Sequence, residues 1–140
     1  MNMLQGQSAT HPSSISQAAA VAALNGPIDF LGPRNATFRE RRDMAVRMLN
    51  EAPGISCQVP EGAFYVYPSC AGAIGKTTSN GRKLGSDTDF VQALLDESLV
   101  AAVQGAAFRL SPYFRISYAT STEALEEAGT RIQKFCDSLT

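Results

Sequence analysis

Arg115 is the residue whose type and setting in this sequence point most directly to binding chemistry. It lies in residues 114–120, where residues alternate in character as they do in a half-buried β-strand. Arg115 is on the same face as the small residues Ser117 and Ala119. The other face, which we expect to join a core, carries the large residues Phe114, Ile116 and Tyr118.

An arginine on a strand is well suited to hold a carboxylate. Its guanidinium group is planar, stays charged, and donates two parallel hydrogen bonds to a carboxylate. A strand fixes that fork more rigidly than a loop does. The pattern alone leaves two plainer alternatives open, because Arg115 could also pair with a nearby acid or face water.

The other reactive side chains form no cluster in the sequence. His11 has no acid or nucleophile spaced with it, so we expect it to cap or pack near its turn. The cysteines are odd in number and widely spaced, which fits neither a disulfide framework nor a metal site. We therefore expect no metal, and ordinary thiols in a reducing cytoplasm. The three cysteines are Cys57, Cys70 and Cys136, and the three lysines are Lys76, Lys83 and Lys134.

The composition fits one compact domain. Of 140 residues, 44% are apolar and 18% are charged, so the chain can bury a core. The net charge is −1, and the basic run at residues 39–42 is interleaved with an acid, which predicts a solvated helix face rather than a nucleic-acid partner. No run approaches the ~18 apolar residues that would span a bilayer, and residues 1–7 are too polar for a signal peptide. We expect neither nucleic acid nor a membrane as partner, and a cytoplasmic location.

The first predicted helix covers about residues 14–25. Ser14 and Gln17 have the spacing of a capping box, and Gly26 is suited to a left-handed helix end. The body of this helix is apolar nearly all round, which favours burial between two packed layers.

Three more helices are predicted from apolar periodicity. Thr120 and Glu123 have the spacing of a capping box at the start of the last one, and residues 75–86 indicate an exposed loop. The three helices cover about residues 36–51, 87–97 and 121–139. The apolar stripe of the last helix is Leu125, Ala128, Ile132, Phe135 and Leu139.

Strands are predicted at about residues 63–67, 100–104 and 114–119. Residues 99–103 are apolar without alternation, as in a strand buried on both faces. Helices that alternate with short strands predict an α/β chain, of the α+β small-domain kind, in which a short sheet is covered by helices.

Several segments carry a family resemblance, in the right order along nearly the whole chain. Residues 60–65 read Pro-Glu-Gly-Ala-Phe-Tyr, residues 103–108 contain Val-Gln-Gly and Phe108, and residues 114–119 read Phe-Arg-Ile-Ser-Tyr-Ala. Residues 5–27 resemble a turn and linking helix, and residues 38–49 resemble a small-domain helix. The chain resembles the C-terminal part of the fold-type I, class I/II aminotransferases, which use pyridoxal phosphate. Bacterial aspartate aminotransferases are the most similar group.

The resemblance implies a role for Arg115, which would bind the α-carboxylate of the substrate. Gly62 and Phe64 lie in a turn that passes close to the active site in the family, so they are secondary candidates for substrate binding. A glycine before a strand also commonly just permits a bend. Tyr65 and Tyr67 are expected to be core or interface aromatics.

The resemblance also implies that a catalytic residue is missing. The family's cofactor lysine lies in a serine-rich stretch before the region that this chain covers, and no lysine here has that context. We expect no catalytic residue in this chain and no cofactor bound to it alone, with pyridoxal phosphate present in a complete enzyme. Two departures from the family pattern are His11, where asparagine is common, and Arg109, in a turn that usually has a small residue.

Two interpretations follow for the whole chain. In the first, residues 1–27 are a remnant of a large domain with its linking helix, and residues 28–140 are the small domain of an enzyme that acts on an amino acid, by resemblance aspartate, and a 2-oxo acid. In the second, the chain is a non-catalytic module for carboxylate binding or self-association. Residues 1–7 resemble the middle of a helix, which favours a fragment, and a bare apolar first helix predicts a homodimer.

Overall fold

The structure is a computed structural model that describes residues 2–9 and 11–140. The chain forms two compact units, Met1–Arg34 and Asn35–Thr140. The boundary predicted at residue 27 is not tested by this division and stays a prediction. None of the described helices is both long and apolar enough to cross a bilayer.

The first unit contains α1 (Asn2–Ser8) and α2 (Ser14–Asn25), and α2 has the predicted bounds. The turn that residues 5–27 resemble does not include residues 5–8, which belong to α1. The predicted capping box is wrong, since Ser13 is the N-cap without a side-chain bond and Gln17 donates to the Pro12 carbonyl instead. Gly26 ends α2 in an extended rather than a left-handed conformation. None of the residues of α2 is buried within this chain.

The helix α3 (Leu31–Asn50) begins five residues earlier than predicted. Gly32 and Pro33 are poor helix formers, but proline is tolerated in a first helical turn, where its missing N–H is not needed, so α3 includes both residues. The inner face of α3 buries Ala45, Val46 and Leu49.

The sheet has three short antiparallel strands in the order β1-β3-β2. They are β1 (Tyr65–Val66), β2 (Val103–Gln104) and β3 (Phe114–Ser117), each shorter than predicted. The prediction that residues 99–103 form a strand buried on both faces is wrong. Leu99 is left-handed and 74% exposed at the end of a helix, and β2 is an edge strand.

Two helices have serine N-caps that supply acceptors for free backbone N–H groups. In α4 (Asp87–Ser98) the Ser86 side chain accepts from the Asp89 N–H, and in α5 (Thr122–Asp137) Ser121 accepts from the Ala124 N–H. The cap of α5 is therefore one residue later than the predicted Thr120. All but one of the residues in the predicted apolar stripe of α5 are buried; Ala128 is partly buried.

The loop at residues 75–86 is more ordered than an exposed loop. Leu84 and Thr78 are buried, and Thr78 donates a hydrogen bond to Glu97. Thr77 pairs with Lys83 in a β-bridge and with the backbone of Thr140. The polar composition of this loop hid these contacts, because most of them are made by the backbone.

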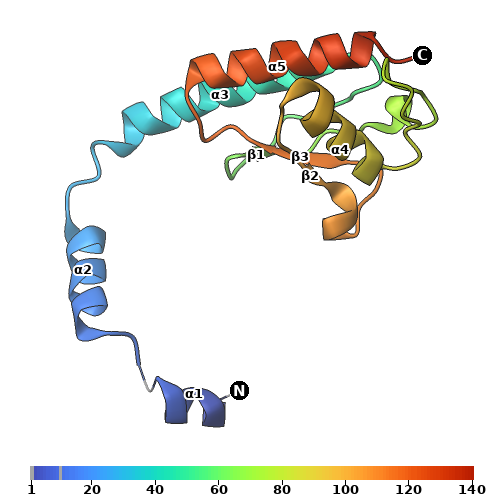
Figure 1. The fold of residues 1–140 in the computed structure, drawn as a ribbon. Helices are drawn as coiled ribbons and strands as arrows, with labels where there is room; N and C mark the ends of the chain where they lie inside the picture. Colours follow the sequence, from blue (N-terminus) through green and yellow to red (C-terminus); the bar gives the residue numbers. More distant parts are fainter. Residues whose placement is uncertain (1, 10) are drawn as a thin grey trace. The chain divides into compact units, whose positions relative to one another are not determined.

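The core lies between the sheet and the helices α3, α4 and α5, and Figure 1 shows α3 and α5 running side by side. Phe114, Ile116 and Tyr118 are 0%, 8% and 2% exposed, so the predicted alternation of β3 is confirmed. The Phe90 ring of α4 contacts the rings of Phe114 and Phe135, with centroids 5.1 and 5.7 Å apart. We call this side of the sheet the core face.

Candidate functional site

Arg115 lies on the central strand β3, opposite Val103 of β2, on the side of the sheet away from the core. Its guanidinium carbon is 4.4 Å from the centre of the Tyr65 ring and 4.6 Å from that of Phe108. Cations are attracted to aromatic faces at this range, and a planar guanidinium also stacks on them. The two rings therefore fix the plane of the guanidinium. We call this side of the sheet the arginine face.

The donors of Arg115 are unpaired within the described part of the chain. Among residues 2–9 and 11–140, no acid forms an ion pair with Arg115 and no group accepts a hydrogen bond from its side chain. The pairing with a local acid that the sequence left open is therefore absent from these residues. Arg115 is also half-buried rather than simply exposed to water. A fixed, half-buried fork with free donors suits a planar anion such as a carboxylate.

Other aromatic residues surround this arginine. Tyr67 stacks on Tyr113 with ring centres 5.6 Å apart, and its ring meets Phe108 edge-on at 6.1 Å. Loss of water raises the pKa of Tyr67, the charge of Asp87 raises it further, and Arg115 opposes both. Tyr65, Tyr67, Tyr113 and several neighbouring residues line an open cavity of about 430 Å³.

Gly62 and Phe64 lie in different places relative to Arg115. The Phe64 ring is 4.4 Å from the Tyr65 ring, so it braces one of the two rings that stack on Arg115. Gly62 lines a separate cavity of about 280 Å³ with Arg39 and Arg42. A Cβ atom added to Gly62 would meet nothing within 4 Å, so no contact in this chain requires glycine there. The roles predicted for both residues stay predictions.

The turn that carries these two residues is held by side chains on both sides of it. The Tyr118 hydroxyl donates to the Ala63 carbonyl at 2.8 Å, and Arg42 donates to the Pro60 carbonyl at 3.3 Å. Ala63 has a left-handed φ of 61°, which these bonds help to maintain.

Part of the site was not predicted from the sequence. Tyr65 was expected in a core or an interface, but it stacks on Arg115. The alternation of residues 65–67 is the signal that could have shown this, since Tyr65 and Tyr67 lie on one side of the extended chain and Val66 on the other. The structure also shows a buried carboxylate, Asp87, next to the turn of Phe108, and no sequence motif singled it out.

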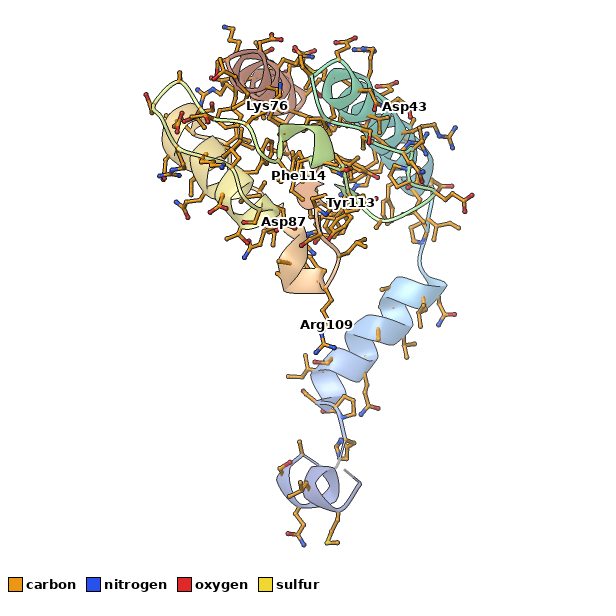
Figure 2. The ribbon with its side chains drawn as sticks, turned by 90° about the vertical axis from the view of Figure 1, so that its right-hand side faces the viewer. Asp43, Lys76, Asp87, Arg109, Tyr113 and Phe114 are labelled. Atoms are coloured by element: carbon orange, nitrogen blue, oxygen red, sulfur yellow. The ribbon has the colours of Figure 1, made fainter. Side chains whose placement is uncertain are left out.

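The lysines lie on other elements. Lys76 and Lys83 belong to the loop at residues 75–86 and Lys134 to the last turn of α5. The charge of Lys76 acts on Cys136 of α5, and Figure 2 shows Lys76 beside that helix, away from Tyr113. His11 contacts the Pro12 carbonyl through Nδ1 at 2.8 Å, which is a local contact near its turn as expected. None of the three lysines therefore belongs to β1, β3 or the turn that carries Phe108.

Comparison with known proteins settles the family. The sequence model for "Aminotransferase class I and II" matches residues 1–132. The chain belongs to the class I and II aminotransferases.

Several members of this family are close in sequence. The chain is 58% identical over 136 residues to a probable aspartate/prephenate aminotransferase of Rhizobium leguminosarum bv. phaseoli, with 97% of this chain and 34% of the relative covered. It is 55% identical over 139 residues to an aspartate aminotransferase of Rhizobium meliloti (strain 1021), with 99% and 34% covered. The chain thus spans about a third of the length of the curated relatives it matches.

Solved aminotransferases have the same fold. The crystal structure of the aspartate aminotransferase from Rhizobium meliloti matches with a TM-score of 0.93 and 54% identity, covering 99% of this chain and 34% of that one. An alanine aminotransferase from Pyrococcus furiosus matches with a TM-score of 0.79 and 35% identity, covering 90% and 30%. The predicted fold, an α/β small domain of the aminotransferase type, is confirmed.

Proposed function

We propose that this chain supplies the substrate-carboxylate site of an aspartate aminotransferase, with Arg115 binding the α-carboxylate of the amino acid and of the 2-oxo acid. One observation carries the proposal. The guanidinium of Arg115 is held between Tyr65 and Phe108, half-buried, with its donors free of partners among the described residues.

This geometry would orient the substrate as well as bind it. Two parallel hydrogen bonds to the carboxylate fix both the position and the rotation of the substrate's Cα atom. Removal of a proton from Cα is fast only when the breaking bond has one orientation toward the group that takes up the electrons, so a rigid clamp lowers the barrier. Tyr65 and Phe108 serve this purpose by holding the clamp still.

The cofactor of the complete enzyme would be pyridoxal phosphate, held by parts of a longer protein. The chain alone would then be inactive in transamination, and its location would be the cytoplasm. Aspartate is the proposed amino acid, because relatives of 55% and 58% identity carry aspartate in their names.

A chimera tests this proposal. The chain replaces the matching 139 residues of the Rhizobium meliloti aspartate aminotransferase, and transamination of aspartate with 2-oxoglutarate is measured. We expect activity in the chimera and none in the isolated chain. Loss of two charge-assisted hydrogen bonds should make Arg115→Ala roughly 100-fold or more poorer in kcat/KM.

The matched control removes an arginine from the neighbouring turn. Arg109 is exposed and left-handed, and Arg109→Ala keeps a non-glycine residue in that conformation. We expect nearly unchanged activity for it. A folded chimera without activity, or an Arg115→Ala chimera as active as its parent, would contradict the proposal.

We also propose that the chain self-associates. Apolar side chains along residues 15–31 are exposed, and a patch of this kind commonly marks an interaction surface. The exposed residues are Ile15, Val21, Leu24, Ile28, Phe30 and Leu31. Sedimentation of the chain at high concentration should give a homodimer, and a monomer at every concentration would contradict this.

The same surface supports the second candidate function, a non-catalytic module that binds carboxylates or associates with itself. The isolated chain distinguishes the two. Succinate binding and dimer formation by the chain, together with an inactive chimera, would favour the module over the enzyme.

A further inference from the structure

Asp87 is a buried carboxylate that the proposed site does not use directly. It is the first residue of α4 and is 1% exposed. Its Oδ2 atom accepts hydrogen bonds from the Ala106 N–H at 3.1 Å and from the Ser111 hydroxyl at 2.7 Å. Both donors belong to the turn at residues 105–111, and Figure 2 shows Asp87 beside that turn, which Arg109 marks.

Helix capping does not account for this arrangement. Ser86 already caps α4, and Asp89 in the same first turn accepts from the Ser86 hydroxyl at 2.8 Å and from the Gly85 N–H at 3.1 Å. The Asp89 carboxylate thus bonds the start of its own helix, whereas the Asp87 carboxylate bonds a different segment. Burying a charged group is costly unless hydrogen bonds compensate. The two hydrogen bonds that compensate for the burial of Asp87 come from the turn at residues 105–111 and not from its own helix.

The turn at residues 105–111 is closed tightly at Gly105. The Gly105 N–H donates to the Tyr113 carbonyl at 2.7 Å, and the Leu110 N–H donates to the Gly105 carbonyl at 3.1 Å. A Cβ atom at Gly105 would lie 2.0 Å from the Leu110 oxygen and 3.1 Å from Asp87 Oδ2, so only glycine fits. This leaves the turn and Asp87 in direct contact.

The turn carries one of the two rings that hold the arginine. Its 3-10 helix η2 (Gly105–Phe108) ends in Phe108, whose ring is 4.6 Å from the guanidinium carbon of Arg115. Phe108 is 47% exposed, and its ring contacts the edge of Tyr67 as well as Arg115. The path from Asp87 to Arg115 therefore runs through two hydrogen bonds and one ring.

We infer that Asp87 is a positioning residue for the carboxylate site, because it anchors the turn that presses Phe108 onto Arg115. Its catalytic consequence rests on the proposed function, but its structural consequence does not. An aromatic ring shifts the NMR signals of protons above its face, so the Arg115 side-chain signals report the stacking directly in the 140-residue chain.

The first experiment compares these signals in three variants of the chain. Asp87→Ala should move the Arg115 Hδ and Hε signals toward the values of an unstacked arginine. Asp87→Asn should restore most of the stacked values, since an amide oxygen can accept the same two hydrogen bonds. Asp89→Ala is the matched control from the same helical turn and should leave the signals in place while it weakens the start of α4.

Ser111→Ala removes only one of the two hydrogen bonds and serves if Asp87→Ala does not fold. It should give a smaller shift in the same direction. Unchanged Arg115 signals in the folded Asp87→Ala chain, or in Ser111→Ala where the former does not fold, overturn the inference.

The second experiment uses the chimera with the Rhizobium meliloti enzyme. Asp87→Ala should raise the KM for aspartate roughly tenfold and change kcat less, and Asp87→Asn should recover the KM, because the change loosens a binding group. A KM that stays at the parent value in a folded Asp87→Ala chimera overturns this part. An inactive parent chimera would contradict the proposed function. The NMR comparison would still show whether Asp87 positions Phe108 against Arg115.

Discussion

The two faces of the three-stranded sheet use aromatic residues for different purposes. On the core face, Phe114 is fully buried and contacts the Phe90 ring of α4. On the arginine face, Tyr65 and Phe108 enclose a charged group instead, and Phe108 is 47% exposed. Alternate residues of one strand, β3, thus supply both the core and the site.

This difference separates stability from recognition. Burial of large side chains on the core face is the main stabilising contribution. In the part of the chain that the structure describes, every buried side-chain nitrogen or oxygen has a hydrogen-bond partner. The arginine face keeps five guanidinium donors unpaired among the described residues, which contributes little to folding but leaves them available for an anion. The faces should therefore respond differently to substitution.

The largest effect is expected on the core face. Phe114→Ala should lower the free energy of unfolding by about 3–5 kcal/mol, because it leaves a cavity against Phe90. Arg115→Ala, one residue away, should lower it by about 1 kcal/mol, the value of a cation–π contact that is still partly open to water. Urea denaturation of both variants measures the contrast. Equal losses would show that the two faces are not distinct.

Alkaline pH should lower the stability of the fold through the three cysteines, which are buried in the core. Burial raises the pKa of Cys57 to about 11 and those of Cys70 and Cys136 to about 12. Thiols in the unfolded chain lose their protons near pH 9, whereas the buried thiols of the folded chain keep theirs to a higher pH. Deprotonation therefore stabilises the unfolded state relative to the folded state in this pH range. Stability should be constant below about pH 8 and should fall as the pH rises from 9 toward 12. Denaturation under reducing conditions tests this, and stability that rises over that interval would contradict the burial of the thiols.

A lysine in place of Arg115 tests whether the positive charge alone or the shape of the guanidinium is needed on the arginine face, and its effect should be smaller. Arg115→Lys keeps the positive charge but loses the fork and most of the stacking. In the chimera we expect kcat/KM for aspartate to fall about 10- to 100-fold, the equivalent of about one charge-assisted hydrogen bond. Arg109→Lys is the control with the same chemical change at an exposed site. Full activity of Arg115→Lys would mean that charge alone suffices.

The smallest effect should appear at a site outside both faces. Leu99 ends α4 with a left-handed φ of 56° and is 74% exposed, so glycine fits better there and little packing is lost. Leu99→Gly should stabilise the chain by about 1 kcal/mol or less while the Arg115 NMR signals stay unchanged. A destabilised variant would show that Leu99 makes contacts that its exposure does not reveal.

The sequence was sufficient to predict the features that depend on the regular spacing of apolar residues. The alternation in β3 and the apolar stripe of α5 follow from spacing alone, and the structure confirms them. The bounds of α2 are also as predicted, although the capping box and the left-handed end used to predict them are not present. Arg115 could be selected as a candidate for the same reason, since alternation places it opposite the core.

Features that depend on distant contacts could not be predicted in this way. Tyr65 and Phe108 are 50 and 7 residues from Arg115, and only the pairing of β1 with β3 and the closure of the turn bring them to it. Asp87 resembles an ordinary helix-start acid, because its bonds to residues 106 and 111 leave no local pattern. The apolar residues 99–103 predict a strand because an apolar residue at a helix end carries no turn signal, whereas Leu99 is the left-handed end of α4.

The most direct test of the account asks whether Arg115 recognises the α-carboxylate itself. β-Alanine is aspartate without that carboxylate, so the affinities of both ligands are measured for the parent chimera and for Arg115→Ala. We predict that the parent binds aspartate far more tightly than β-alanine and that Arg115→Ala loses nearly all of this preference. A preference that survives in Arg115→Ala would contradict the account, because the α-carboxylate would then be bound elsewhere.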